Sequence, residues 1–354
     1  MMKCVQFNDE KMYIEDFLAI SKKLYQQDHT ENPNEIKKLL RGTHPLSHYF
    51  KLNKFLIYQN DRVAGRFVIT IYPDDSTAYI GFFECVNNME AAAYLFDQAY
   101  QFAKKQGLAR IVGPVDASFW IKYRLKINMF KGVPYTGEPY NKDYYYKLFL
   151  DNEYQVVEHY TSNVFGTVGN EYENEKYHQR YLDFLKKGYQ IQSVDMSEFE
   201  MKLKELYQLL TELYSDFPIY KHVSEEDFIE LFRDYKKIMN PQMVKFAYYQ
   251  NQLVGFFISV PNYHNLVYHL NLFGILKLLK QKRHPKEYVM LYMGVDQSHK
   301  GLGKALAYSI MMELRSSHLP SIGALARDGK VTQNYAEDLI ECRYEYVLLE
   351  KKIL

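Results

Sequence analysis

Two stretches of the chain share one pattern of hydrophobic and polar positions. Residues 54–63 and 245–254 both read KFxxYQNxxV. In each copy an alternating stretch is followed by polar residues suited to a turn and then by a second alternating stretch, which predicts an antiparallel hairpin. A repeated hairpin indicates that the chain is built from two related halves.

The elements expected after each hairpin also follow one order: strand, helix, strand, helix, strand. In the first half the pattern predicts them over 77–85, 90–106, 110–112, 141–150 and 154–165. In the second half it predicts them over 288–295, 303–316, 321–326, 334–341 and 344–351. Helical periodicity precedes the hairpins over 14–27, 34–40, 196–213 and 225–239.

This order predicts an α+β fold in which a mixed sheet carries helices on both faces, and the fold occurs twice. We place the first domain at residues 1–165 and the second at 178–354. The segment 166–177 begins with residues rich in Gly, Asn and Glu and is the expected linker.

Composition excludes several classes of protein. The chain has 354 residues, with 44 Lys plus Arg against 43 Asp plus Glu, so no excess of basic residues suits a nucleic-acid partner. The three cysteines, Cys4, Cys85 and Cys342, lie far apart, which favours neither a disulfide framework nor a metal site. The apolar stretches are too short for a membrane span, and the first residues do not resemble a signal peptide, so we expect a cytoplasmic protein with no membrane partner.

The segment after the strand 288–295 has the character of an anion-binding loop. Gly301 and Gly303 lie just before a helix whose core-facing stripe is Leu306, Ile310 and Leu314. A helix N-terminus presents unpaired N–H groups, and glycines let phosphate oxygens approach them closely. An ordinary strand-to-helix turn also uses this Gly-x-Gly spacing, so the spacing alone leaves both interpretations open.

The sequence from Ser298 to Gly303 resembles motif A of the GCN5-related N-acetyltransferase (GNAT) superfamily, (Gln/Arg)-x-x-Gly-x-(Gly/Ala). Ser298 stands where that motif has Gln or Arg. The whole chain resembles a bacterial group with two such domains in tandem, on the stretches 80–85, 113–114 and 140–145. The resemblance implies two GNAT-like domains and a CoA thioester, acetyl-CoA or another acyl-CoA, as co-substrate, without a metal.

In the family the thioester lies where the fourth and fifth strands separate, which implies a set of binding residues here. The backbone of Met293, Gly294 and Val295 would hold the pantetheine arm and the thioester carbonyl. Asn334 would face the same arm, although with Glu337 it also fits a helix N-cap. The pyrophosphate would be held by the amides of Ser298, His299, Lys300, Gly301, Leu302, Gly303 and Lys304.

The first half lacks this loop, because the corresponding residues 84–90 contain no glycine and carry acidic side chains. We therefore expect this half to bind no CoA.

Acyl transfer to an amine needs a base and an acid, and the sequence offers three main candidates, with Tyr344 and Tyr346 as further options for the acid. Glu287, just before the strand 288–295, is the candidate base, or else a solvated strand end. Tyr335 is the candidate acid, as the resemblance suggests a tyrosine in this region, or else a packed core residue. Tyr292 would share one face with Tyr288 and Met290 by the two-residue period of a strand.

The expected activity is an acyl-CoA-dependent N-acyltransferase that transfers its acyl group directly to a small amine or amino-acid-like acceptor. Two alternatives remain: a non-catalytic module that senses CoA or another ligand, and an aminoacyl-tRNA-dependent transferase of the same fold. The near-neutral charge weighs against the tRNA-dependent alternative. Assembly as a homodimer stays open.

Overall fold

The chain forms two compact units, and neither is contiguous in sequence. The computed structural model describes residues 1–26, 31–268 and 271–354; the expected helix end at residue 27 lies outside them. Unit 1 holds residues 1–134, 138–159 and 345–354, and unit 2 holds 135–137 and 160–344. The long strands β9 (Gln155–Phe165) and β15 (Ile340–Lys352) contribute to both units, whereas the sequence analysis places a single linker at 166–177.

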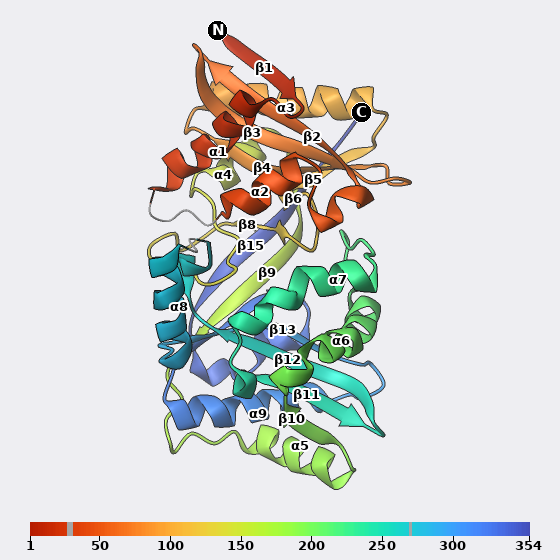
Figure 1. The fold of residues 1–354 in the computed structure, drawn as a ribbon, viewed down its shortest axis with the longest axis vertical. Coiled ribbons are helices and arrows are strands. Elements are labelled where there is room, and N and C mark those ends of the chain that lie inside the picture. Colours follow the sequence, from red (N-terminus) through yellow and green to blue (C-terminus); the bar gives the residue numbers. More distant parts are fainter. Residues whose placement is uncertain (27–30, 269–270) are drawn as a thin grey trace. The chain divides into compact units, whose positions relative to one another are not determined.

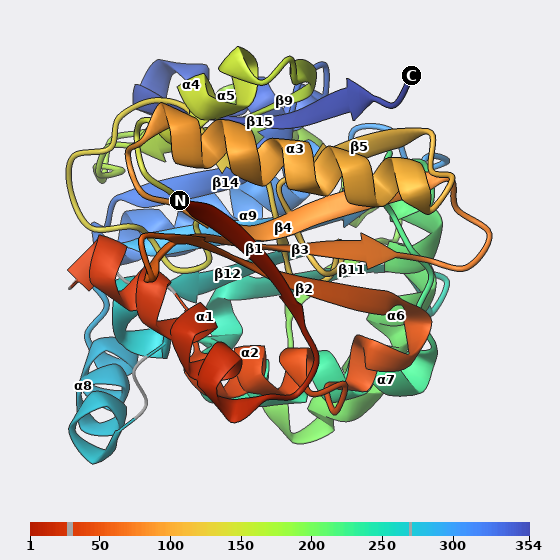
Figure 2. The ribbon, with the colours of Figure 1, turned by 90° about the horizontal axis from the view of Figure 1, so that it is seen from above.

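Unit 1 is a mixed sheet with helices on both faces. Strands β1 to β4 are antiparallel neighbours, β4 pairs with β5 in parallel, and the second part of β15 pairs with β5 and β8. Figure 2 shows α3 on one face of these strands and α1 and α2 on the other. The elements are β1 (Met2–Phe7), α1 (Lys11–Tyr25), α2 (Pro33–Leu40), β2 (Lys51–Gln59), β3 (Arg62–Ile71), β4 (Thr77–Cys85), α3 (Met89–Lys105), β5 (Arg110–Gly113), β6 (Val115–Asp116), β7 (Lys122–Tyr123), β8 (Leu125–Lys126) and α4 (Tyr145–Asp151).

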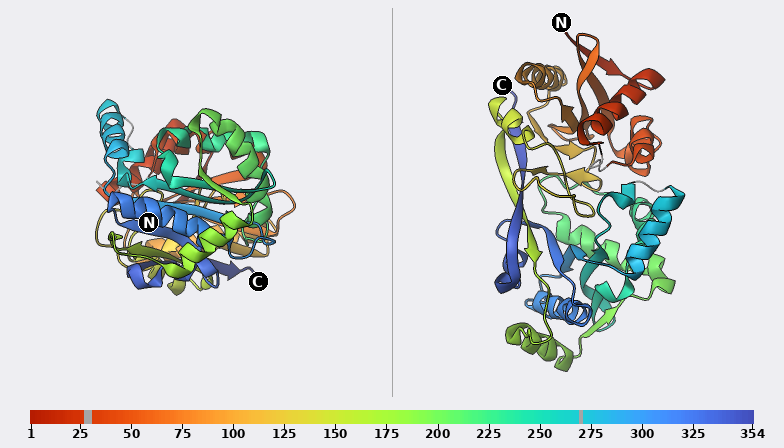
Figure 3. Two further views of the ribbon diagram at one scale, coloured as in Figure 1. Left: turned by 90° about the horizontal axis from the view of Figure 1, so that it is seen from below. Right: turned by 90° about the vertical axis from the view of Figure 1, so that its left-hand side faces the viewer.

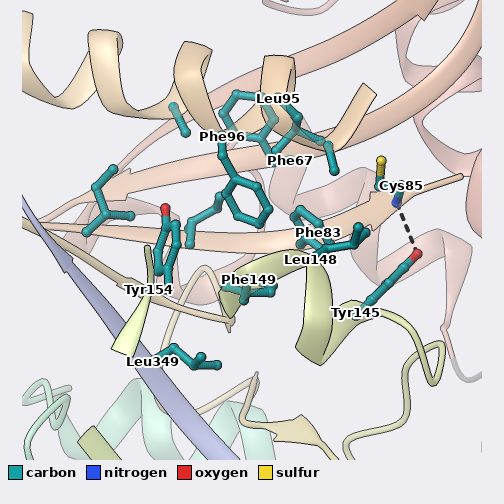
Figure 4. Packing of buried hydrophobic residues seen from close by; sticks show 14 of the residues in the cluster. Phe67, Phe83, Cys85, Leu95, Phe96, Tyr145, Leu148, Phe149, Tyr154 and Leu349 are labelled. Carbon is teal, nitrogen blue, oxygen red and sulfur yellow. Dashed lines mark hydrogen bonds between the residues drawn. The ribbon is translucent and has the colours of Figure 1, made fainter. Parts of the chain in front are cut away.

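Aromatic side chains fill the core between α3 and this sheet. Phe83 stacks on Phe96 of α3 with ring centroids 5.0 Å apart, and Phe149 of α4 contacts both rings. The hydroxyl of Tyr145 accepts a hydrogen bond from the N–H of Cys85 (Figure 4). Burying each such ring stabilises the fold by about 1.5–3 kcal/mol, which is why the apolar pattern of 90–106 predicts α3 correctly.

Unit 2 repeats this architecture. Its sheet runs β10–β11–β12–β13–β14 and is completed by the second part of β9. Helices α5 and α9 lie side by side (Figure 1), and α9 and α6 contact opposite faces of the sheet (Figure 3). The elements are α5 (Glu175–Lys186), β10 (Gln190–Ser193), α6 (Phe199–Tyr214), α7 (Glu225–Phe232), β11 (Val244–Tyr249), β12 (Gln252–Pro261), α8 (Leu272–Arg283), β13 (Tyr288–Val295), α9 (Leu302–Ser317) and β14 (Ser321–Arg327). The predicted fold class is confirmed.

The two hairpins exist, but the identical residues of the KFxxYQNxxV pattern are not structurally equivalent. In the first hairpin Ile57 pairs with Gly65, and in the second Ala247 pairs with Gly255. Each pair lies next to a bulge. This pairing shifts the repeat by one residue relative to the sequence match. Lys54 therefore donates to the carbonyl of Leu40, whereas Lys245 reaches Glu313 on the opposite side of its sheet, because a shift of one residue exchanges the faces of a strand.

Several predicted boundaries are wrong for local backbone reasons. The helix expected over 334–341 is replaced by two 3-10 turns, Val331–Asn334 and Glu337–Leu339, because Tyr335 is extended and Ala336 is left-handed. The end of the expected linker is helical, since Asn174 caps α5 through the N–H of Tyr177. The helix expected over 225–239 ends at Phe232 and continues as the 3-10 turn η4 (Arg233–Lys237).

Candidate functional site

Strands β13 and β14 of unit 2 separate partway along their length. They pair in parallel only as far as Met290 and Gly323. Leu291 is a bulge, because Ile258 and Ser259 of β12 pair with Tyr292 and Met290 and leave it unmatched. Beyond this point the β14-facing edge of β13 has no ladder partner in β14, so its backbone groups are available to a ligand.

Strand β13 is more exposed than β4, the corresponding strand of unit 1. Every residue of β4 is buried, but in β13 only Tyr288 and Val289 are. In unit 1 the segment Val115–Asp116 lies against β4, so that a Cβ on Gly81 would overlap the carbonyl of Val115. The carboxylate of Asp116 accepts from the N–H of Phe82 at 2.5 Å, which occupies an amide that a thioester carbonyl would otherwise need.

The loop between β13 and α9 leaves some of its amides available. Asp296 holds the loop by accepting from the N–H and the hydroxyl of Ser298, at 2.8 and 2.6 Å. The amides of Ser298, His299, Leu302 and Lys304 all bond within the loop. Within residues 1–26, 31–268 and 271–354, the amides of Lys300, Gly301 and Gly303 have no acceptor. The predicted set of seven amides is therefore reduced to these three.

Gly301 is the N-cap of α9 and adopts a left-handed conformation with φ 93°, which favours glycine. No side chain caps this helix. In unit 1 the turn runs only from Val86 to Asn88, and Asn88 caps α3 by accepting from the N–H of Ala91 at 3.0 Å. The longer, uncapped turn of unit 2 can hold a phosphate at its helix N-terminus, and the short, capped turn of unit 1 does not offer that place.

Four cationic side chains surround the N-terminus of α9. A Cβ on Gly301 would lie 3.9 Å from Nε of Arg180, which α5 places beside the loop. Burial, followed by the positive charges of Lys176 and Arg180, lowers the pKa of Lys304. Lys300 belongs to the loop itself. Among the described residues no carboxylate forms an ion pair with any of these four, so their charge favours a bound anion.

Lys176 and Arg180 were missed by the sequence analysis, which placed Lys176 in the linker and predicted no helix around Arg180. A signal was present: Tyr177, Tyr181 and Phe184 recur at helical spacing and pack against α9. Lys176 and Arg180 are four residues apart and therefore share one face of α5.

Gly303, Met293 and Tyr335 lie together. A Cβ on Gly303 would be 2.6 Å from the hydroxyl oxygen of Tyr335 and 2.9 Å from the methyl group of Met293. The ring of Tyr335 packs edge-on against Tyr177, and burial raises the pKa of Tyr335 to about 12. A hydroxyl with a raised pKa remains protonated and can donate a proton, and it lies over the first turn of α9.

The two other predicted catalytic residues, Glu287 and Tyr292, do not join this cluster. The carboxylate of Glu287 accepts a hydrogen bond from the side-chain amide of buried Asn262, and Glu287 is about 13 Å from Leu291 at the spacing of a strand. Tyr292 does not share a face with Tyr288 and Met290, because the bulge at Leu291 shifts the alternation. After the bulge the side packed against α9 continues with Met293 and Val295.

His299 and Asn334 have different surroundings. Nδ1 of His299 lies 2.6 Å from the hydroxyl of Tyr189, which fixes the loop to the rest of unit 2. Asn334 is exposed at the end of a 3-10 turn, so the predicted N-cap role is wrong. Across the described ranges, no group of three or more His, Cys, Asp or Glu side chains could hold a metal ion. None of the helices in those ranges is long and apolar enough to span a bilayer.

Solved structures with the same fold extend over the whole chain. A tandem GNAT protein from the clavulanic acid biosynthesis pathway matches with a TM-score of 0.55 and 9% identity, and the match covers 100% of this chain and 99% of that one. A GCN5-related N-acetyltransferase from Sphaerobacter thermophilus matches with a TM-score of 0.51 and 11% identity, covering 99% and 96%. A GCN5-related N-acetyltransferase from Anabaena variabilis ATCC 29413 matches with a TM-score of 0.53 and 10% identity, covering 98% and 72%.

A scan against protein-family models and a search of curated proteins both find no match. The identities to the solved structures are low, so the likeness concerns the fold. The chain has the fold of tandem GNAT proteins, and the resemblance drawn from Ser298 to Gly303 is confirmed at that level.

Proposed function

We propose that unit 2 binds acetyl-CoA or another acyl-CoA and that the protein transfers the acyl group to a small amine or amino-acid-like acceptor. The main support for this proposal is that several groups suited to CoA lie together at one end of β13. There the free amides of Lys300, Gly301 and Gly303, four cations and an unpaired strand edge meet. The amides and cations suit a pyrophosphate, and the strand edge suits the amide groups of a pantetheine arm.

The transfer proceeds by attack of a neutral amine on the thioester carbonyl. The C–N bond forms, the C–S bond breaks, the ammonium proton leaves to a base or to water, and the departing thiolate takes up a proton. Backbone N–H groups on the free edge of β13, beyond Leu291, would stabilise the oxyanion. Tyr335 has a protonated hydroxyl near Met293 of this strand, since both lie within 3 Å of the Cβ position of Gly303.

A second candidate is a module that binds CoA without turnover. It is favoured by one observation, the hydrogen bond that holds the carboxylate of Glu287 to Asn262 at the far end of β13. A release assay distinguishes the two, with free thiol measured from acetyl-CoA across a panel of amines and amino acids. Turnover with any acceptor supports the transferase, and tight CoA binding without turnover supports the binding module.

The CoA site itself is tested by two substitutions of one residue. Gly301→Asp places a carboxylate beside the free amides, and Gly301→Asn places a neutral side chain of the same shape there. Both tolerate the left-handed backbone comparably, so any difference between them reports charge. Calorimetry with CoA should show a much larger loss of binding in the Asp variant than in the Asn variant, because both side chains can occupy the amides but only the carboxylate repels the phosphate. Equal affinities would refute the assigned site.

A further inference from the structure

Helix α8 of unit 2 carries an apolar stripe that faces solvent. Leu272, Ile275, Leu276 and Leu279 are spaced i, i+3, i+4 and i+7, a pattern that normally faces a core. Leu272 is 81% exposed, Leu276 64%, and the adjacent Phe273 77%. A group of exposed large apolar side chains on one helix indicates an interaction surface.

The opposite side of α8 is the one that attaches to unit 2. Gly274 and Leu278 are buried there. Near the end of the helix, Gln281 donates to the carbonyl of Asn262, and Nζ of Lys282 donates to the carbonyl of Lys237 at 2.9 Å. In Figure 2, α8 extends outward beyond the strands of its own unit. The solvent-facing stripe is therefore a second apolar face, in addition to the one that attaches the helix.

Basic side chains border the exposed stripe. Lys277, Lys280, Arg283 and Lys286 are exposed, and no carboxylate forms an ion pair with any of them in the part of the chain that the structure describes. By helical spacing, Lys280 and Arg283 lie on the same side as Leu276. Lys282 is engaged by backbone carbonyls, and burial lowers its pKa, so it anchors the helix instead of joining this group.

We propose that α8 lies on the surface of an anionic lipid bilayer, with Leu272, Phe273 and Leu276 among the acyl chains and the basic side chains at the headgroups. Apolar residues bordered by Lys and Arg are the composition of interfacial helices. A second copy of the chain is a poorer occupant, because pairing two α8 stripes would bring Lys280 and Arg283 of both copies together. Anionic headgroups supply the opposite charge.

This inference does not depend on acyl transfer, and it replaces the expectation of no membrane partner. That expectation rested on the absence of a stretch long enough to span a bilayer, which a helix lying in the interface does not need. The helix would place unit 2 at the membrane surface without inserting through it.

Vesicle sedimentation tests the proposal with the full chain. Vesicles of phosphatidylcholine alone are compared with vesicles that also contain phosphatidylglycerol, at about 0.1 M and about 0.5 M salt. The wild type should bind the anionic vesicles, with weaker binding at high salt and to phosphatidylcholine alone. The triple variant Leu272→Ser/Phe273→Ser/Leu276→Ser should lower the partition coefficient at least about 100-fold. Lys277→Gln/Lys280→Gln/Arg283→Gln should lower it on the order of 100-fold on anionic vesicles only.

Each variant has a matched control elsewhere on the surface. Met12, Leu150 and Met201 are exposed apolar residues whose replacement by Ser should leave vesicle binding unchanged. Lys22, Lys23 and Lys105, replaced by Gln, remove the same charge from other helices.

Three outcomes overturn the proposal. The first is a wild type that does not bind anionic vesicles. The second is an apolar triple variant whose thermal unfolding temperature falls well below that of its control, which would mean that the stripe is packed inside the protein. The third is a lipid-free dimer in analytical ultracentrifugation that the same variant converts to a monomer, which would assign the stripe to a second copy.

Discussion

Arg180 provides the most direct test of how the anion site works. A phosphate oxygen bound at the amide of Gly301 would lie roughly 6 Å from the guanidinium, given the 3.9 Å between Nε and the Cβ position of Gly301. The Coulomb energy of two unit charges at that distance is about 0.7–2.8 kcal/mol for dielectric constants of 80 to 20. Because Arg180 is exposed, the lower half of this range applies. Arg180→Gln should therefore weaken CoA binding about three- to twentyfold.

The measurement compares two ligands by calorimetry at low salt. CoA carries the pyrophosphate, and acetyl-pantetheine has the same arm without it. The Arg180→Gln variant should lose affinity for CoA alone, and its CoA affinity should depend less on salt concentration than that of the wild type. Lys186→Gln removes a charge from the last turn of the same helix and serves as the control.

If Arg180→Gln binds CoA as tightly as the Lys186→Gln control, Arg180 does not contribute to the anion site. The charge assignment is also wrong if Arg180→Gln lowers the affinity for acetyl-pantetheine by the same factor as the affinity for CoA. The effect would then come from the shape of the loop and not from the charge at the pyrophosphate.

Three other predictions concern packing, stoichiometry and pH. Gly303→Ala should lower stability by about 1–3 kcal/mol through crowding against the hydroxyl of Tyr335, and adding Tyr335→Phe should recover part of that loss in thermal unfolding. Calorimetry should give one CoA per chain, since Asp116 occupies the amide of Phe82 and Asn88 caps α3, and a value of two would mean that unit 1 also binds CoA. Burial raises the pKa of Glu84 to about 7. Its carboxyl therefore holds a proton in the folded state that the unfolded chain releases at lower pH, and stability should fall as pH rises from 5 to 8 by on the order of 2 kcal/mol. Urea unfolding followed by fluorescence of Trp120 should show this fall in the wild type and a smaller fall in Glu84→Gln.

The sequence predicted the parts of the fold whose apolar period is regular. The strand ending at Val295, the glycines of the loop and the stripe of Leu306, Ile310 and Leu314 each appear where the pattern places them. Local pattern could not show how two strands align. The matched residues Lys54 and Lys245 lie on opposite faces because the turn falls at Asn60 and Asp61 in one hairpin but at Gln250 and Asn251, one residue earlier in the match, in the other.

Bulges and backbone conformation also explain the errors at the site. The period of two predicts one face for Met290 and Tyr292, but the extra residue Leu291 separates them. The helix expected from Asn334 fails because Ala336 takes a left-handed conformation, which its side chain does not favour and which surrounding contacts must impose. Of the two cations of α5, Lys176 was missed because a polar segment rich in Asn and Glu was taken for a linker, and Arg180 because no helix was predicted around it.

The two halves give opposite solutions to one problem, the free backbone edge that appears where parallel strands separate. Backbone N–H groups need acceptors. Unit 1 supplies them from its own chain, with Asp116 on the amide of Phe82, whereas in unit 2 the β13–β14 ladder ends at Met290 and Gly323. Amide hydrogen exchange rates should therefore differ between β4 and β13. The amides of β4 should be slow with or without ligand, and the β14-facing amides of β13 should become slow only when acetyl-CoA is added. Slow exchange along β13 in the free protein would mean that its edge is already bonded and that no groove exists for the pantetheine arm.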